Sequence, residues 1–370
     1  MITPCPSHRR PFIPPPNLKG IFAGSGNAGM GDPYIARAVV DLVQKPPHQV
    51  SLMYLGTATY DIDKFRENQT KSFLKLGCHV RSLDVANNNN NNNNNESSES
   101  PPLSLEDMAE AVDKADIILV SGGNTQYAVD RWKYLGLDEL LKDASLQGTV
   151  MCGGSAGAIC WFDGGHSDSM DPDTYRVPML EKFQPEPTIQ KISEKESSQT
   201  KKAAVARSAY FDEGTNTIMS NPQEGAVKEW EYIRVEGLSI LPGLICPHFD
   251  RVQSNGIARM IDFDSMMKRH SSELGIGIDH YAALEIDGED FRILSIPGQK
   301  GSIGDAGDEP GTGTPGAWIK YVDESGTLQS MVCPSRGKVK DLLQMVDDNT
   351  RFLLDERVEL CRKQNPGPMQ

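Results

Sequence analysis

The chain has 370 residues, of which 38% are hydrophobic and 24% charged, and its formal net charge is −14. This acidic balance argues against a nucleic-acid-binding protein, because phosphate binding draws on a surplus of Lys and Arg. No apolar run approaches the roughly 20 residues that cross a bilayer, so we expect no membrane association.

Short apolar segments alternate with amphipathic ones through the first half of the chain. Strands are predicted over residues 19–23, 50–55, 78–85, 117–120 and 150–152. Helices are predicted over residues 35–43, 65–76, 105–115 and 127–141, where apolar residues recur at helical spacing. Strict alternation with mainly apolar strands indicates an α/β fold with a mostly parallel sheet flanked by helices on both faces.

The second half continues the same core, so a single domain over residues 19–335 is expected. Further strands are predicted within residues 275–286, 291–296 and 317–322. A proline-rich, disordered lead precedes the domain over residues 1–18, and a C-terminal helical segment and tail follow over residues 336–370. Three low-complexity or polar stretches are expected to be insertions, at residues 87–102 (with an asparagine tract over 87–95), 185–202 and 301–316.

The most informative motif surrounds Ser155. A buried strand ends in Gly153 and Gly154, and Ala156 and Gly157 follow the serine. This run matches the Gly-x-Ser-x-Gly elbow, in which a sharp strand-to-helix turn exposes a nucleophilic hydroxyl beside a backbone N–H for the oxyanion. The competing interpretation is a glycine-rich turn in which Ser155 caps the helix.

Two other glycine-rich turns follow predicted strands. Residues 24–29 satisfy Gly-x-Gly-x-x-Gly, but the acid that would hold a ribose is missing after the next strand, so we predict a tight turn and no dinucleotide. Gly123 and Asn124 follow another strand, where glycine lets an N–H point at a substrate oxygen. The alternative there is an ordinary turn capped by Asn124 or Thr125. No cofactor and no metal site are expected.

A serine nucleophile needs a base and an acid that orients it. Among seven histidines His248 is the best base, because it closes a buried strand, with His166 and His280 as alternatives. Sequence spacing leaves three carboxylates open as the orienting group: Asp168, Asp250 and Asp279.

Four ordered motifs together resemble the peptidase E / cyanophycinase-type serine peptidases. They are residues 122–125, 154–158, 241–250 and 277–280, and the resemblance covers roughly residues 19–286. It implies a fold like that of class I glutamine amidotransferases, Ser155 as nucleophile and His248 as base. It further implies Gly123 and Ala156 as backbone donors to the oxyanion, and Asp168 near an aspartate implicated in the family.

One position departs from the family pattern. Relatives carry a carboxylate that contacts the base where this chain has His280, with Asp279 just before it. A neutral imidazole stabilises an imidazolium less well, and losing the orienting carboxylate of a triad can cost on the order of 10⁴ in turnover. Either Asp279 or Asp168 substitutes, or the chain is slow or inactive.

The expected function is a serine peptidase that acts on small peptides, above all dipeptides with N-terminal aspartate, with Arg259 facing the substrate carboxylate. The alternatives are a cyanophycinase or isoaspartyl peptidase on β-linked aspartyl peptides, and a catalytically impaired pseudo-peptidase. Cys152 or Cys160 as nucleophile is a further option, although burial suits both better. The seven scattered cysteines and the absence of an apolar signal segment favour a cytoplasmic protein, as a monomer or homodimer.

Overall fold

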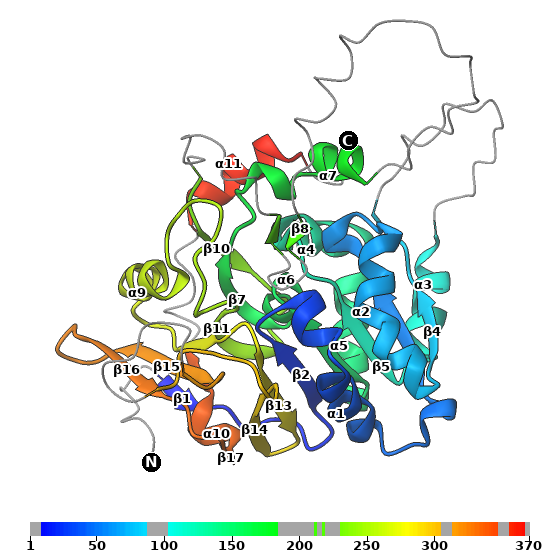
Figure 1. The fold of residues 1–370 in the computed structure, drawn as a ribbon, viewed down its shortest axis with the longest axis horizontal. Coiled ribbons are helices and arrows are strands. Elements are labelled where there is room, and N and C mark those ends of the chain that lie inside the picture. Colours follow the sequence, from blue (N-terminus) through cyan, green and yellow to red (C-terminus); the bar gives the residue numbers. More distant parts are fainter. Residues whose placement is uncertain are drawn as a thin grey trace, which may run out of the picture.

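Two β-sheets form the centre of the molecule (Figure 1). The computed structural model describes residues 9–86, 103–183, 211–212, 217–218, 230–304, 313–346 and 355–366. In spatial order the eight-stranded sheet consists of β17 (Arg336–Lys338), β14 (Asp290–Ser295), β13 (Ala282–Asp287), β2 (Lys19–Ala23), β6 (Val150–Gly154), β5 (Ile117–Val120), β3 (Ser51–Leu55) and β4 (His79–Ser82). From β2 to β4 all neighbours are parallel, whereas β13, β14 and β17 add antiparallel pairs.

The six-stranded sheet is built from the second half of the chain. Its order is β10 (Ile233–Glu236), β7 (Phe162–Ser167), β11 (Leu241–Cys246), β12 (Gly275–Ile278), β15 (Ala317–Val322) and β16 (Leu328–Val332). Here β11 runs parallel to β7 and β12, and the remaining pairs are antiparallel. Two-stranded pairs complete the described strands: β1 (Arg9–Pro11) with β18 (Gln344–Val346), and β8 (Phe211–Asp212) with β9 (Thr217–Ile218).

Helices cover both faces of the parallel strands, so the predicted α/β class is confirmed. On one face, α1 (Pro33–Val43) and α2 (Asp63–Leu76) share a core with Ile21, Leu52 and Ile117. On the other face, α3 (Leu105–Asp113), α4 (Thr125–Leu135) and α5 (Leu137–Gln147) pack with the alternate residues Phe22 and Met53. The division follows from strand geometry, since successive side chains point to opposite faces.

The remaining helices are α6 (Ala156–Ile159), α7 (Arg176–Lys182), α9 (Arg259–Arg269), α10 (Val339–Leu342) and α11 (Arg357–Gln364). The α9 residues Phe263, Met266 and Met267 cover the six-stranded sheet at Leu244 and Cys246. None of the described helices has the length and hydropathy of a membrane-spanning segment.

The structure corrects three expectations about individual elements. The helix expected over residues 127–141 is split into α4 and α5, because Gly136 adopts a left-handed conformation (φ 73°) and ends α4. The C-terminal segment contains strands as well as helices, since β17 pairs with β14 and β18 with β1. The lead expected to be disordered contributes β1, where the buried Arg9 donates to the Ser271, Ser272 and Val322 carbonyls.

The three predicted insertions fall largely on residues that the structure does not describe. Residues 87–102 and 185–202 lie outside the described residues, as do residues 305–312 within the third insertion. The two ends of that third insertion are described. They are joined by bridges between Gly301 and Gly313 and between Ile303 and Thr314.

Two of the connections between the sheets carry residues of the predicted site. After β6 of the eight-stranded sheet, Ser155 and α6 lead into β7 of the six-stranded sheet. In the opposite direction, the turn over Asp279 and His280 leads from β12 into β13. Both connections therefore lie at the junction of the two sheets.

Candidate active site

Ser155 occupies a sharp, strained turn between β6 and α6. Its backbone has φ 56° and ψ −122°, a region that non-glycine residues adopt rarely and that recurs at functional sites. The hydroxyl makes no capping hydrogen bond with α6, although Ser155 stands at the N-cap position. The side chain is thus not used as the cap that the competing interpretation of the motif required, and the residue keeps 6% exposure.

Backbone packing makes the small neighbours of Ser155 necessary. A Cβ atom at Gly154 would lie 2.0 Å from the Ser25 carbonyl oxygen, and one at Gly157 would lie 2.2 Å from the Val120 carbonyl oxygen. A Cβ atom at Gly153 would lie 2.4 Å from the Gly157 carbonyl oxygen. Real Cβ atoms do not approach main chain so closely, so the turn can form only with glycine at these positions.

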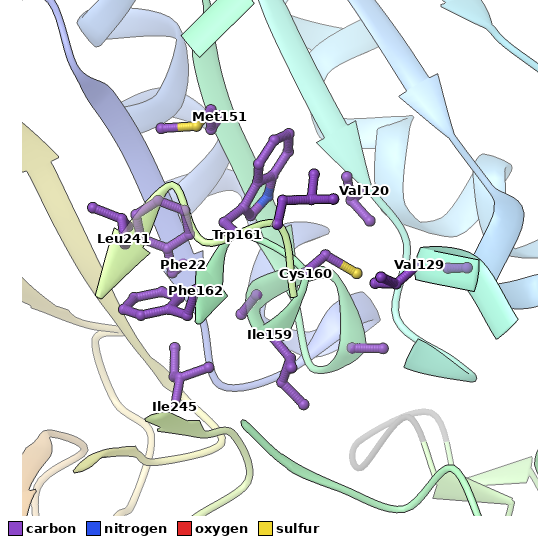
Figure 2. Packing of buried hydrophobic residues seen from close by; sticks show 14 of the residues in the cluster. Phe22, Val120, Val129, Met151, Ile159, Cys160, Trp161, Phe162, Leu241 and Ile245 are labelled. Atoms are coloured by element: carbon purple, nitrogen blue, oxygen red, sulfur yellow. The ribbon is translucent and has the colours of Figure 1, made fainter. Parts of the chain in front are cut away.

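The core beneath this turn is densely packed. Figure 2 shows Ile159, Cys160, Trp161 and Phe162 from the α6–β7 connection among residues of the neighbouring strands. The Trp161 indole N–H donates to the Cys152 carbonyl at 3.3 Å, and the Phe162 ring meets Phe22 edge to face at 5.3 Å. Burial raises the pKa of the Cys152 and Cys160 thiols strongly, so neither is a thiolate that could replace Ser155 as nucleophile.

The backbone N–H groups of Ser155 and His248 bind two adjacent residues at the end of β2. The Ser155 N–H donates to the Ala23 carbonyl at 3.2 Å, and the His248 N–H donates to the Gly24 carbonyl at 3.0 Å. His248 follows β11 with a positive φ of 51°, and its side chain is buried. The two residues therefore lie at the same edge of the sheet junction. Among the described residues no hydrogen bond links the Ser155 hydroxyl to the His248 ring; in unliganded enzymes such contacts are often long.

The partner of His248 is another histidine. Its Nδ1 lies 2.8 Å from Nδ1 of His280, so one ring nitrogen donates and the other accepts. Burial lowers the pKa of His248 well below its usual value, and the charges of His280, Arg259 and Arg251 lower it further. The imidazole is thus neutral at pH 7, as a general base must be.

The backbone of His280 is held at both ends. Its N–H donates to the Asp250 carboxylate at 2.8 Å, and its carbonyl accepts from the Ser25 hydroxyl at 2.6 Å. Asp279, the residue before His280, lies against Gly24. A Cβ atom added at Gly24 would be 1.9 Å from the Asp279 carbonyl oxygen. The glycine-rich run after β2, predicted to be a tight turn, thus supports both histidines.

Asp279 turns its carboxylate away from the histidine pair. It accepts from the Ser302 N–H at 2.8 Å, the Ser302 hydroxyl at 2.7 Å and the Gly316 N–H at 3.0 Å. Burial, followed by the nearby Asp250 carboxylate, raises the pKa of Asp279 to about 7. The structure therefore brings the base together with His280 and gives Asp279 other partners.

Asp168 and Arg259 are paired with each other. Their closest oxygen and nitrogen are 2.9 Å apart, and the guanidinium also donates to Gln253 and to the His166 and Pro247 carbonyls. Arg259 is fully buried. This network ties the ends of β7 and β11 to the start of α9, and it occupies the guanidinium that the sequence suggested for the substrate carboxylate.

The Gly123 loop lies beside the elbow. Gly123 has φ 124°, and a Cβ atom there would lie 2.2 Å from the Ala58 carbonyl oxygen, so only glycine fits. Asn124 caps α4 by accepting from the Tyr127 N–H, and its amide donates to the Ser169 carbonyl and the Thr174 hydroxyl. The Asn124 side chain, proposed for substrate binding, is therefore committed to the fold. Its capping role matches the alternative kept open for this loop.

His166 is a structural histidine. Its Nε2 lies 2.9 Å from the Asp262 carboxylate and its ring stacks on Tyr232 at 4.2 Å. Burial lowers the pKa of His166 to about 4. Within the described ranges, no three His, Cys, Asp or Glu side chains are arranged to hold a metal ion.

Sequence reasoning missed one charged residue at this edge. Arg251 follows His248 by three positions; its side chain keeps 31% exposure, and its charge is close enough to lower the pKa of His248. The guanidinium lies 5.2 Å above the Tyr281 ring, and its Nε has no hydrogen-bond partner, with the Asp250 carboxylate 3.6 Å away. The signal in the sequence was its place in the motif around His248.

Comparison with known proteins finds a similarity to peptidases. Residues 21–185 match the model of peptidase family S51. This match spans less than half of the chain, and over that segment the chain is similar to S51 peptidases. The match includes Ser155 and Gly123, whereas His248 and His280 lie beyond it.

Individual relatives differ in coverage and in description. A protein of Trypanosoma brucei brucei described as G2/mitotic-specific cyclin-1 is 28% identical over 335 residues, 88% of either chain. An uncharacterized peptidase of Bacillus subtilis, YgaJ, is 33% identical over 158 residues, which are 42% of this chain and 62% of the relative. The crystal structure of a peptidase from an acI-B1 actinobacterium aligns with a TM-score of 0.46 at 15% identity, covering 90% of this chain and 98% of that one.

Proposed function

We propose that this chain, which matches the S51 model over residues 21–185, is a serine peptidase of that type and hydrolyses short peptides with an N-terminal aspartate. Ser155 attacks the carbonyl carbon, His248 takes the hydroxyl proton and returns it to the leaving amine, and water then hydrolyses the acyl-enzyme. The Gly123 and Ala156 N–H groups receive the oxyanion. The observation that carries this proposal is the strained Ser155 turn, held on Ala23 next to the residue that holds His248.

The histidine pair supports one tautomer of the base. His248 can accept the serine proton at Nε2 only if its Nδ1 carries hydrogen. That hydrogen is donated to Nδ1 of His280, which must then be neutral and protonated at Nε2. His280 thus fixes the tautomer and ring orientation of His248, as the carboxylate of a triad does, but without its negative charge. We therefore expect slower turnover than in enzymes with a carboxylate at this place.

Arg251 supports the specificity for an acidic substrate group. Arg259 is completely buried and lies 2.9 Å from Asp168, whereas the Arg251 side chain keeps 31% exposure near the base, with its Nε 3.6 Å from the Asp250 carboxylate. A planar guanidinium binds a carboxylate through two parallel hydrogen bonds, which favours aspartate over neutral residues. We assign the substrate carboxylate to Arg251 in place of Arg259.

The decisive experiment is hydrolysis of Asp-Leu by the purified full-length protein. The wild type should release aspartate, and Ser155→Ala should lose on the order of 10⁴ or more in kcat. A fluorophosphonate probe should label the wild type and leave Ser155→Ala unlabelled. Equal hydrolysis by the folded Ser155→Ala variant would exclude this mechanism.

Specificity is tested by comparing Asp-Leu with Asn-Leu, which differ by one charge. Arg251→Gln should lower the preference for Asp-Leu in kcat/KM by roughly 10- to 100-fold, since hydrogen bonds to charged groups contribute about 1.5–3 kcal/mol. Arg37→Gln, which removes an exposed arginine on α1, is the control and should leave the preference unchanged. An unchanged preference in Arg251→Gln would refute this role of Arg251.

The alternatives are resolved with the same protein. Faster hydrolysis of β-linked than of α-linked aspartyl peptides would favour the cyanophycinase or isoaspartyl branch. Absence of both hydrolysis and probe labelling would favour a pseudo-peptidase. The cell-cycle description of the trypanosome relative is not carried over, because no feature of this site supports it.

A further inference from the structure

A small hairpin stem contacts the turn that carries His280. The stem consists of residues 301–303 and 313–316, joined by the bridges between Gly301 and Gly313 and between Ile303 and Thr314. Ser302 and Gly316 of the stem donate hydrogen bonds to the Asp279 carboxylate. The Asp279 N–H in turn donates to the Gly316 carbonyl at 3.0 Å. The residue next to His280 is therefore bound on both backbone and side chain by a segment outside the residues of the S51 match.

The Ser302 hydroxyl is oriented as a hydrogen-bond donor to Asp279. It accepts from the Trp318 indole N–H at 2.7 Å, so its own hydrogen is directed at the Asp279 carboxylate, 2.7 Å away. Asp279 is completely buried, and no contact of its carboxylate with His248 is present in the described residues. Its carboxylate thus serves the turn and does not touch the base.

The opposite side of the turn is held by the active-site loops. Ser25 holds the His280 carbonyl and Asp250 holds its N–H. With the stem on one side and these two contacts on the other, the backbone around His280 has little freedom. The direction in which its Nδ1 meets His248 depends on all of them.

We infer that the stem is a positioning element of the active site, which acts through Ser302 and Asp279 to aim His280 at the base. The kinetic part of this inference rests on the proposed function. Asp279 and Ser302 are positioning residues, because they act through His280 and touch neither the substrate nor His248. The described ends of the late insertion thereby have a role in the chemistry.

The test compares two serines of the same region. Ser302→Ala removes the hydroxyl that binds Asp279, whereas Ser295→Ala removes a hydroxyl that donates to the Pro315 carbonyl at 2.6 Å and does not reach Asp279. With Asp-Leu, Ser302→Ala should lower kcat about 10-fold with KM nearly unchanged, since misaimed catalytic groups cost rate more than binding. Ser302→Thr, which keeps the hydroxyl, should recover most of kcat, and Ser295→Ala should match the wild type.

A second readout does not depend on catalysis. The Nδ1 hydrogen shared by His248 and His280 should give a distinct signal in ¹⁵N-resolved NMR of the histidine rings. Ser302→Ala should shift or broaden this signal in a protein that still unfolds cooperatively, and Ser295→Ala should not. If the wild type hydrolyses no peptide, the proposed function fails but the ring signal still decides the inference. If Ser302→Ala does not fold, Asp279→Asn replaces it in both measurements.

Two results would overturn the inference. One is an unchanged kcat and ring signal in Ser302→Ala, or in Asp279→Asn where that variant is used. The other is an equal loss in Ser295→Ala, which would indicate general loosening of the hairpin.

Discussion

The connections that carry Ser155 and His280 between the sheets position these residues by different means. At Ser155 the turn is positioned by main-chain packing. Glycines at 153, 154 and 157 let the turn approach the neighbouring backbone so closely that no side chain fits between them. At His280 the turn is positioned by side-chain hydrogen bonds. Ser25 and Asp250 bind the His280 backbone, and Ser302 binds the neighbouring Asp279. The proposed nucleophile is placed by close packing, and the partner of the proposed base is placed by polar contacts.

This difference bears on which residues can vary. A turn formed by backbone contact excludes every side chain at its glycines, because any added Cβ displaces main chain. In a turn held by hydrogen bonds to its backbone, the backbone stays in place whether the side chain that it presents is an imidazole or a carboxylate. His280 can therefore stand where a carboxylate is expected from the resemblance, with the turn still held by the same contacts.

The first prediction breaks the elbow. Gly154→Ala places a Cβ atom 2.0 Å from the Ser25 carbonyl oxygen and should destabilise the protein by about 3 kcal/mol or more, as overpacking against a rigid backbone does. Gly77→Ala is the control: an added Cβ atom there meets nothing within 4 Å, so even with the positive φ of Gly77 (97°) it should cost only about 1 kcal/mol. Urea unfolding measures both, and similar losses would contradict the role of packing.

The second prediction exchanges the partner of the base. His280→Ala leaves the Nδ1 hydrogen of His248 unpaired and should lower kcat by about 10²-fold, since a buried donor without a partner costs roughly 1–3 kcal/mol. His280→Gln offers an amide oxygen as acceptor and should retain more activity than His280→Ala. Steady-state kinetics on Asp-Leu give the ranking, and equal activity of the wild type and the folded His280→Ala variant would show that His280 does not assist the base.

The local parts of the fold were predictable from sequence. Alternating apolar segments identified the five parallel strands and their helices, because each element's periodicity is visible within its own residues. The break at Gly136, however, depends on one residue adopting a left-handed conformation. The pairing of β1 with β18 joins residues more than 300 positions apart, which no local pattern reveals.

The site divides in the same way. The glycines that form the turn around Ser155 lie within five consecutive residues, so the elbow could be predicted from the sequence. The partners of Asp279, His280 and Arg259 come from distant segments, so spacing alone left three carboxylates open and suggested a buried, paired arginine for the substrate. Only the folded chain shows that Asp279 binds Ser302 and that Arg251 is a partly exposed arginine whose charge acts on His248.

The last prediction concerns pH and depends on His248 being neutral. Burial, with the charges of His280, Arg259 and Arg251, lowers the pKa of His248 below its usual value. A base with a lowered pKa stays unprotonated to lower pH, so kcat/KM for Asp-Leu should remain flat as pH falls from 7 to 6.5 and decline only below that. Arg251→Gln removes one positive charge and should raise the pKa of His248, moving the decline upward by less than about one pH unit. Rates measured between pH 4.5 and 7, with circular dichroism to verify folding, test this. A decline centred at or above pH 6.5 in the wild type would mean that the imidazole is better solvated than its burial indicates, and that the turn holding His280 opens in solution.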